Sequence, residues 1–171
     1  LEAVGAGHQP RPAVEGYPAY MKAMAAFSSD SRAIDLNHDY IRRIVSSLKG
    51  HPAIFSWQIC NEPRCFSDLP EVRDAFVNYI HSTAALIKSI DPVHMVSTGN
   101  EGQMGCESDM GLYERVNTCD DIDYITIHIW PYNWSWVRED SVNDGMEEAI
   151  VKIGKYIDDH LELAVRLGKP L

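Results

Sequence analysis

The chain has 171 residues, of which 45% are hydrophobic and 23% are charged, so it is an ordinary globular sequence and not a collagen-like, disordered or coiled-coil one. Its 15 basic and 25 acidic residues give a net charge of −10, which argues against nucleic acid or an anionic membrane surface as a partner. The four cysteines include no C-x-x-C pair, and no apolar run approaches the roughly 18 residues of a membrane span, so neither a zinc cluster nor a transmembrane helix is expected.

The first predicted elements are helical. Residues 1–33 are rich in glycine and proline, which favours the tail of a helix, a long loop and one or two helical turns. A clear helix is then predicted over residues 37–49, with Asn37 capping its start and Gly50 closing its end. Its apolar residues recur at the spacing of one helical face: Ile41, Ile44, Val45 and Leu48.

A strand is predicted over residues 53–60, a short apolar run with many strand-forming side chains. Alternate residues differ in character. One face carries Phe55, Trp57 and Ile59, and the other carries Ser56, Gln58, Cys60 and Glu62. Such a strand is typical of a barrel, in which one face packs against helices and the other lines the lumen.

Downstream, helices and strands continue to alternate. A helix over residues 69–90, capped by Ser67 or Asp68, has an apolar face of Val72, Phe76, Tyr79, Ile80, Thr83 and Ile87. The sequence then predicts a strand over residues 94–98, a polar loop over 99–111 and a short helix over 112–116. A further strand over 122–129 and a last helix over 144–167 follow. The last helix is expected to bury Met146, Ile150, Ile153, Ile157, Leu161 and Ala164. This alternation is typical of a β/α barrel, but three strands are too few to close one, which takes about 250 residues.

A polar motif, Asn61-Glu62-Pro63-Arg64, ends the first predicted strand. In a β/α barrel the carboxyl ends of the strands build the active site, so Glu62 is a candidate acid or base. Pro63 stops the strand and fixes the backbone after Glu62, and Asn61 offers a neutral donor for a substrate hydroxyl. The alternative interpretation is a glutamate in an ordinary surface turn.

Three motifs in chain order resemble strands of one enzyme clan. The segment from His51 to Arg64, with a Trp and apolar residues before Asn-Glu-Pro, resembles the fourth barrel strand of the clan A glycoside hydrolases. The segment from Ser97 to Gly102 resembles the end of the fifth strand of the family 5 β-mannanases, and the segment 122–131 resembles their sixth strand. The chain is therefore identified as resembling glycoside hydrolase family 5, and within it the endo-β-1,4-mannanases.

This resemblance implies a fold of the α/β class, a partial (β/α)8 TIM barrel with roughly strands four to six and their helices. Residues 1–171 are expected to form one fragment of a single catalytic domain, truncated at both ends. The resemblance also implies a retaining hydrolase of β-1,4-mannan that needs no cofactor, with Glu62 as the acid/base. The family's nucleophile belongs to a seventh-strand pattern that begins like Lys169-Pro170-Leu171, so the fragment alone is expected to be inactive. Family members are usually secreted, which implies an extracellular or periplasmic location.

The resemblance further implies substrate-binding residues around Asn61 and Glu62. His128 matches the family histidine beside the scissile bond, although a lone strand histidine is often a core residue. Trp130 stands where the family commonly has a tyrosine that donates to the nucleophile, which leaves it as an N–H donor or a sugar platform. Arg64 could bind a sugar hydroxyl or pair with a loop carboxylate.

Two further residues have both a binding and a structural interpretation. Glu101 could be a subsite residue or a loop-stabilising acceptor. Trp134 lies in an aromatic stretch and could stack on a sugar ring or pack against the barrel rim.

Other interpretations of the chain stay open. Within the enzyme class, the parent protein could be an exo-β-mannosidase or an endo-β-glucanase, and from another class it could be a catalytically inactive barrel that binds carbohydrate. No metal site is expected, because the cluster of Asp120, Asp121 and Asp123 suits a solvated turn. Cys65 and Cys106 follow neighbouring strands, but free thiols are expected. The sequence leaves the oligomeric state open.

Overall fold

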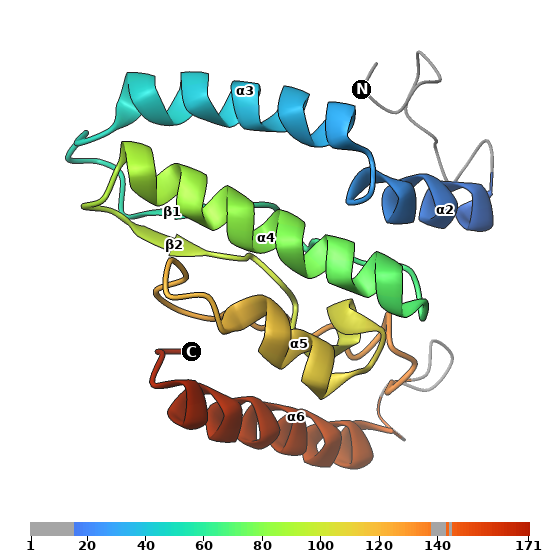
Figure 1. Ribbon diagram of the computed structural model, residues 1–171. Coiled ribbons are helices and arrows are strands. Elements are labelled where there is room, and N and C mark those ends of the chain that lie inside the picture. Colours follow the sequence, from blue (N-terminus) through green and yellow to red (C-terminus); the bar gives the residue numbers. More distant parts are fainter. Residues whose placement is uncertain (1–15, 138–142, 144) are drawn as a thin grey trace.

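The structure is a computed structural model that describes residues 16–137, 143 and 145–171 (Figure 1). Its elements are, in chain order, α2 Tyr17–Phe27, α3 Ser31–Leu48, β1 Ser56–Gln58, α4 Pro70–Ile90, β2 Met95–Ser97, the 3₁₀ helix η2 Gln103–Cys106, α5 Met110–Asn117 and α6 Met146–Leu167. β1 and β2 pair in parallel with Trp57 opposite Val96, and α4 is the crossover between them. This part of the chain is thus an α/β unit, as the sequence predicts.

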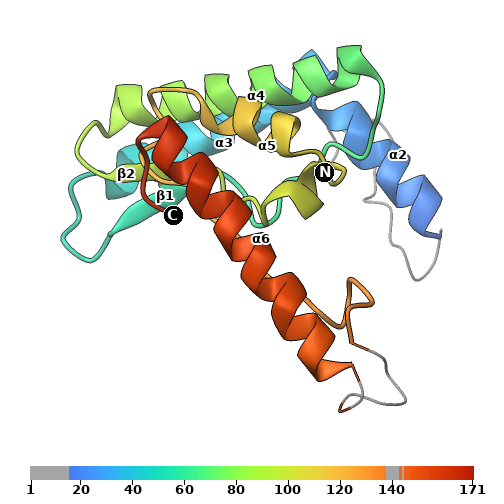
Figure 2. The same cartoon turned by 90° about the horizontal axis from the view of Figure 1, so that it is seen from below.

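Helices cover one face of the two-stranded sheet. Figures 1 and 2 show α3, α4 and α5 as a layer on that face, with α6 beyond α5. Two clusters of buried apolar side chains form the core between these helices and the sheet. One cluster joins α4, α5 and α6 through residues that include Ile80, Tyr113 and Leu163. The other joins α3 to the strands through Val45 and Val96, so the core lies on the helical side of the sheet.

Before β1, α2 is longer and α3 starts earlier than predicted, whereas the prediction for residues 1–15 lies outside the described residues. α2 has 11 residues, where the sequence suggested one or two turns, and α3 starts well before residue 37. Asp30, not Asn37, caps α3, because its carboxylate accepts the N–H groups of Arg32 and Ala33 at 3.0 and 3.1 Å. Asn37 lies inside the helix and accepts a hydrogen bond from the Tyr79 hydroxyl. Periodicity missed this start because polar Asn37 and His38 stand three and four residues after Ile34, where the apolar row would continue.

α4 matches the helix predicted over residues 69–90 except at its cap. Leu69 is the N-cap residue, and the Ser67 hydroxyl accepts the Leu69 N–H at 3.2 Å instead of capping the helix itself. The predicted apolar face is buried apart from Val72, which is half-buried. α4 lies between α3 and α5 and packs against both, which is why the periodicity of its apolar residues was a sound guide.

The strands are shorter than predicted, and the third predicted strand is wrong. β1 and β2 have three residues each, and the segment 122–129 is not a strand. Its Asp123 N–H donates to the Val96 carbonyl at 2.8 Å. The Asp123 carboxylate also accepts the Val96 N–H at 2.7 Å and pairs with Lys88 at 2.7 Å. The Asp123 carboxylate binds the Val96 N–H, which in a regular sheet would donate to a backbone carbonyl, so no regular ladder of backbone hydrogen bonds forms between this segment and β2. Asp123 is therefore more than part of a solvated turn.

The buried face of α6 also differs from the predicted one. The sequence favoured the face with Ile150 and Leu161, but both are exposed, and neighbouring Val165 is 82% exposed. Of the predicted face Ala164 is buried, and the other buried residues of the helix are Ala149, Tyr156, His160 and Leu163. Hydrogen bonds and ring contacts of Tyr156 and His160 orient the helix, and apolar periodicity does not detect them.

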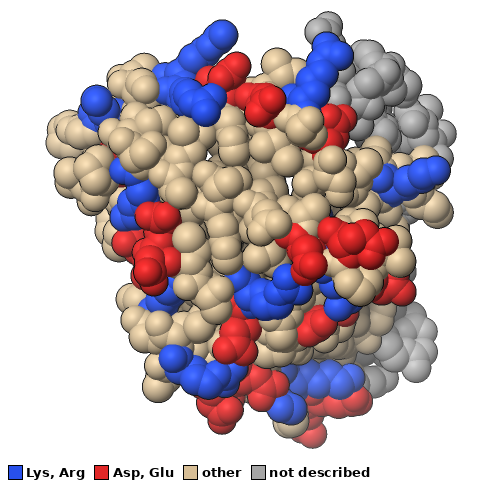
Figure 3. All heavy atoms as spheres, in the orientation of Figure 1, with Lys and Arg blue, Asp and Glu red and all other residues tan. Residues whose placement is uncertain are grey.

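Acidic and basic side chains are interspersed over the face seen in Figure 3. Among the residues described, no helix is long and apolar enough to cross a membrane. The same part of the chain holds no group of three His, Cys, Asp or Glu side chains that could bind a metal ion. The four cysteines are free thiols, and Cys65 and Cys106 are buried.

Candidate active site

Glu62 lies where the chain leaves the sheet. The pairing with β2 continues beyond β1, because the Ile59 N–H donates to the Ser97 carbonyl at 3.0 Å and the Glu62 N–H donates to the Gly99 carbonyl at 2.9 Å. Glu62 has a φ of 51°, in the left-handed region that side-chain-bearing residues rarely adopt. Buried Pro63 follows it. The strand therefore ends in a fixed bend that carries a carboxylate, and strained backbone of this kind is concentrated at functional sites.

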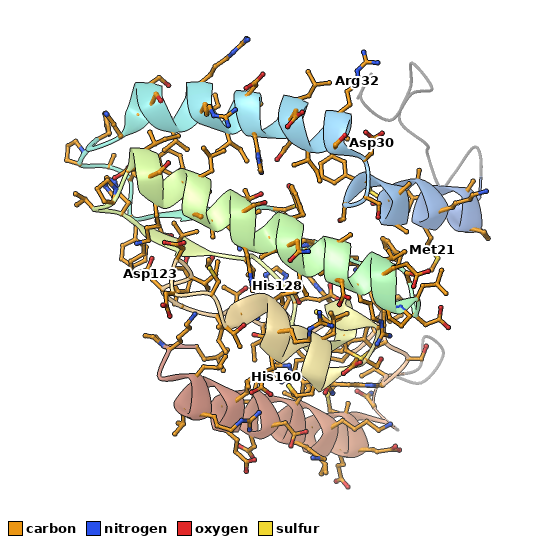
Figure 4. The ribbon with its side chains drawn as sticks, viewed as in Figure 1. Met21, Asp30, Arg32, Asp123, His128 and His160 are labelled. Atoms are coloured by element: carbon orange, nitrogen blue, oxygen red, sulfur yellow. The ribbon has the colours of Figure 1, made fainter. Side chains whose placement is uncertain are left out.

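Two ring N–H groups bind the Glu62 carboxylate from the segment 122–130. His128 Nδ1 donates to Glu62 Oε1 at 2.7 Å, and Trp130 Nε1 donates to the same oxygen at 2.8 Å. Figure 4 shows where His128 lies, behind α4 and α5 in that view. The structure thus brings together three of the residues predicted for the site, from segments more than sixty residues apart in the chain.

These donors set the ionisation of Glu62. Partial burial alone raises the pKa of its carboxyl group, but the hydrogen bonds from His128 and Trp130 favour the charged form and outweigh burial. The pKa of Glu62 is therefore below the ordinary value of a glutamate. In this arrangement Glu62 is an ionised carboxylate held by two donors.

Arg64 and Glu101 form an ion pair beside Glu62. The Arg64 guanidinium binds Glu101 Oε1, and the Glu101 side chain is 0% exposed. Burial raises the pKa of Glu101, Arg64 opposes this, and the nearby Glu62 carboxylate raises it again, so the pKa lies above its ordinary value. Glu101 Oε2 is buried without a hydrogen-bond partner. The two glutamates are thus pushed in opposite directions, with Glu62 favoured as the charged one.

The aromatic residues that follow His128 divide into two groups. Trp130 is 49% exposed although it binds Glu62, and Tyr132 is also exposed. Trp134 instead packs against Trp136, with ring centroids 4.9 Å apart, and against Tyr156 of α6 at 5.2 Å. The structure therefore places Trp130 with the carboxylate and places Trp134 in an aromatic contact with a helix.

Asn61 is exposed and lines a cavity of about 620 Å³ together with Glu62 and Arg64. α2 contributes Tyr20 and Met24 to the same cavity. The sequence indicated no role for α2, because the glycine- and proline-rich residues before it obscured the helix. Nor did it indicate Tyr156 and His160 of α6, whose only signal was a pair of ring side chains four residues apart in an amphipathic helix.

Comparison with known protein families gives a match over nearly the whole chain. A family model described as "GH family 5 beta-mannosidase-like" matches residues 8–171. The chain is 28% identical over 169 residues to the "Probable mannan endo-1,4-beta-mannosidase F" of Aspergillus flavus, covering 91% of this chain and 34% of that protein. The chain thus spans about a third of the length of the curated relatives it matches.

Solved structures that resemble this chain include proteins of the same kind. A glycoside hydrolase family 5 mannosidase from Rhizomucor miehei, a mutant in complex with mannosyl-fructose, superposes with a TM-score of 0.79 at 26% identity, covering 99% of this chain and 41% of that one. The endo-1,4-beta-mannanase of the same organism superposes with a TM-score of 0.55 at 29% identity, covering 72% and 43%. The predicted fold, part of a β/α barrel, is confirmed by these likenesses.

Proposed function

The chain belongs to glycoside hydrolase family 5, in its β-mannosidase-like group, and from this premise we propose that the whole protein is a retaining hydrolase of β-1,4-mannan. The observation that supports this most is the environment of Glu62, a carboxylate at the end of a barrel strand that is held by His128 and Trp130. Carboxyl ends of barrel strands are where such enzymes place their chemistry. The name of the Aspergillus flavus relative supports mannan as the substrate class.

In the proposed reaction Glu62 is the acid/base. It gives a proton to the leaving glycosidic oxygen, and it later takes a proton from the water that releases the glycosyl-enzyme. The donors His128 and Trp130 lower the pKa of Glu62, so the first step needs an opposing influence that protonates it. A second carboxylate at the roughly 5–5.5 Å typical of retaining enzymes supplies one, because like charges raise each other's pKa.

Glu101 does not serve as that second carboxylate in this proposal. Its side chain is fully buried and paired with Arg64, so it cannot reach the anomeric carbon of a sugar. The nucleophile is instead proposed to lie in the segment that follows Leu171, as the family resemblance implies. Exposed Trp130 and Tyr132 offer aromatic faces for pyranose rings, while Asn61 and Arg64 offer polar donors beside them.

The test is Glu62→Gln in the full-length protein, with Glu114→Gln as the matched control. Glu114 lies on α5 and pairs with Arg166 near the surface, away from Glu62. We expect Glu62→Gln to remove most hydrolysis of mannan but to spare much of the first step on dinitrophenyl β-mannoside, which needs little proton donation. Glu114→Gln should retain both activities.

Two outcomes would contradict the proposal in different ways. Equal loss on mannan and on the activated mannoside would show that Glu62 is not the acid/base. Binding of mannan by the wild-type protein without hydrolysis of any β-mannoside would favour the alternative of an inactive carbohydrate-binding barrel.

An exo-acting β-mannosidase is the second candidate function. The observation behind it is the better superposition on the Rhizomucor miehei protein named only a mannosidase, with a TM-score of 0.79, than on the protein named an endo-mannanase, with 0.55. Products released from mannohexaose distinguish the two. An endo enzyme gives a mixture of shorter oligosaccharides from the start, whereas an exo enzyme releases mannose alone. Secretion, which the family resemblance implies, stays a prediction.

A further inference from the structure

Tyr156 of α6 connects a helix of the outer layer to the residues around Glu62. We propose that Tyr156 is a positioning residue, whose hydroxyl holds the Glu101 backbone carbonyl and, through that carbonyl, the segment that carries His128. This inference rests on the proposed function of Glu62. It concerns residues that touch neither the substrate nor the reacting atoms.

The Glu101 carbonyl is a junction between three parts of the chain. It accepts the Tyr156 hydroxyl at 2.7 Å and the His128 N–H at 3.1 Å. The side chains of Glu101 and His128 both lie at the site, because Glu101 pairs with Arg64 and His128 donates to Glu62. The Tyr156 hydroxyl therefore donates to the Glu101 carbonyl oxygen, the backbone atom through which Glu101 and His128 are hydrogen-bonded.

His160, one turn further along α6, holds the next part of the same loop. Its Nε2 accepts the Gln103 N–H at 2.9 Å, and its Nδ1 donates to the Tyr156 carbonyl at 2.6 Å. Its ring lies 4.1 Å from that of Tyr156 and is fully buried. In Figure 4 it lies on the side of α6 that faces α5. Neutral imidazole is required for this arrangement, because Nε2 must accept, and burial lowers the pKa of His160 accordingly.

Gly102 shows how closely α6 approaches the loop. Its φ is 101°, and a Cβ at this position would overlap the Tyr156 hydroxyl and lie 2.7 Å from His160 Nε2. Only glycine allows this approach. The rings of Tyr156 and His160 therefore pack directly against the backbone between Glu101 and Gln103. The hydrogen bond from the Tyr156 hydroxyl to the Glu101 carbonyl forms in this tightly packed region.

This geometry gives Tyr156 a specific effect on the reaction. Without the hydroxyl, the Glu101 carbonyl loses one of its two donors, and the position of the His128 backbone is less tightly set. The donor to Glu62 then shifts with it, and a displacement of about 1 Å at a reacting group can lower a rate by about 100-fold. The step that depends on proton transfer by Glu62 is the one that should suffer.

The test compares Tyr156→Phe with Thr83→Val in the full-length protein. Thr83 is a matched control because it is fully buried, and its hydroxyl donates to the Tyr79 carbonyl at 2.7 Å and contacts His38, all within α3 and α4. We expect Tyr156→Phe to lower kcat/KM on mannan by about tenfold and to lower it much less on dinitrophenyl β-mannoside. Thr83→Val should leave the ratio of the two activities unchanged.

Amide hydrogen exchange supplies a readout that does not depend on activity. The Met104 N–H donates to the Tyr156 hydroxyl at 3.4 Å. In Tyr156→Phe the amides of Gln103, Met104 and His128 should exchange faster than in the wild type, and in Thr83→Val they should not. Equal loss on both substrates, or unchanged exchange at these amides, would overturn the positioning role. If the wild type hydrolyses no β-mannoside, the proposed function fails, and the exchange data then decide the inference alone.

Discussion

Trp130 and Trp134 stand four residues apart but have different surroundings. Trp130 is half-exposed and gives its N–H to Glu62. Trp134 packs its ring on Trp136 and Tyr156. A sugar platform needs an accessible ring face, whereas a ring in an aromatic cluster contributes mainly to packing. At the scale of single residues, we therefore expect one to act in binding and the other in stability.

Substitution of each by alanine separates these roles. Trp134→Ala should lower the free energy of unfolding by about 2–3 kcal/mol, somewhat below the 3–5 kcal/mol typical of a fully buried tryptophan, because Trp134 is only half-buried. Trp130→Ala should change the free energy of unfolding little and weaken binding of mannohexaose. Denaturant unfolding and calorimetry in a Glu62→Gln background measure the two effects. Weakened binding with unchanged stability in Trp134→Ala would reverse the assignment.

Among the elements, the end of α4 is held by one buried carboxylate. Asp91, the C-cap residue, accepts Trp57 Nε1 of β1 at 3.0 Å and His94 Nδ1 at 2.7 Å. Burial alone raises the pKa of Asp91, but these hydrogen bonds and the positive charge of His94 lower it to about 2. Asp91 thus ties the crossover helix to β1 and to the start of β2.

This bond network predicts a dependence of stability on pH. Because the folded pKa is below the ordinary value of 3.8, the stabilisation is complete above about pH 4 and is lost as the pH falls towards 2, a change of about 2 kcal/mol. Asp91→Asn should lack this component. The measurement is the free energy of unfolding of both proteins between pH 5 and pH 2. Parallel curves for the two proteins would contradict the assignment.

The elements also show what the sequence could and could not predict. The apolar face of α4 was predictable because neighbouring helices cover it on both sides. The start of α3 was not, since polar Asn37 and His38 stand between Ile34 and Ile41 and interrupt the apolar row, and the cap is made by the Asp30 side chain. The prediction of a third strand was wrong because the Asp123 carboxylate accepts the Val96 N–H that a backbone carbonyl would otherwise accept. Glu62, His128 and Trp130 were found together through motifs, whereas Tyr156 was missed because only the tertiary structure brings it to Glu101.

At the scale of the whole molecule, the described chain is a part of a barrel and not a closed one. Its sheet has two strands, whereas a complete β/α barrel has eight. Unpaired strand edges expose N–H and C=O groups that pair readily with other chains. The outer stripe of α6, with Ile150, Leu161 and Val165 exposed, adds apolar surface to these edges.

We therefore predict that residues 1–171 expressed alone neither hydrolyse mannan nor remain monomeric. Inactivity is expected because the proposed nucleophile lies outside these residues, and self-association is expected from the open edges and the apolar stripe. Light scattering and a mannanase assay beside the full-length protein check both points. A monodisperse, active monomer would contradict the proposed location of the nucleophile.

The glycines at 99 and 102 decide where this sequence is free to vary. A side chain at Gly99 would overlap the Cys60 carbonyl, and one at Gly102 would overlap the Tyr156 hydroxyl, whereas Gly154 on α6 has no atom within 4 Å of an added Cβ. In a saturation library selected for function, both loop positions should retain glycine alone, while position 154 should drift towards alanine, the better helix former. Selection on this protein would then act as strongly on two backbone positions that tolerate no side chain as on the Glu62 carboxylate.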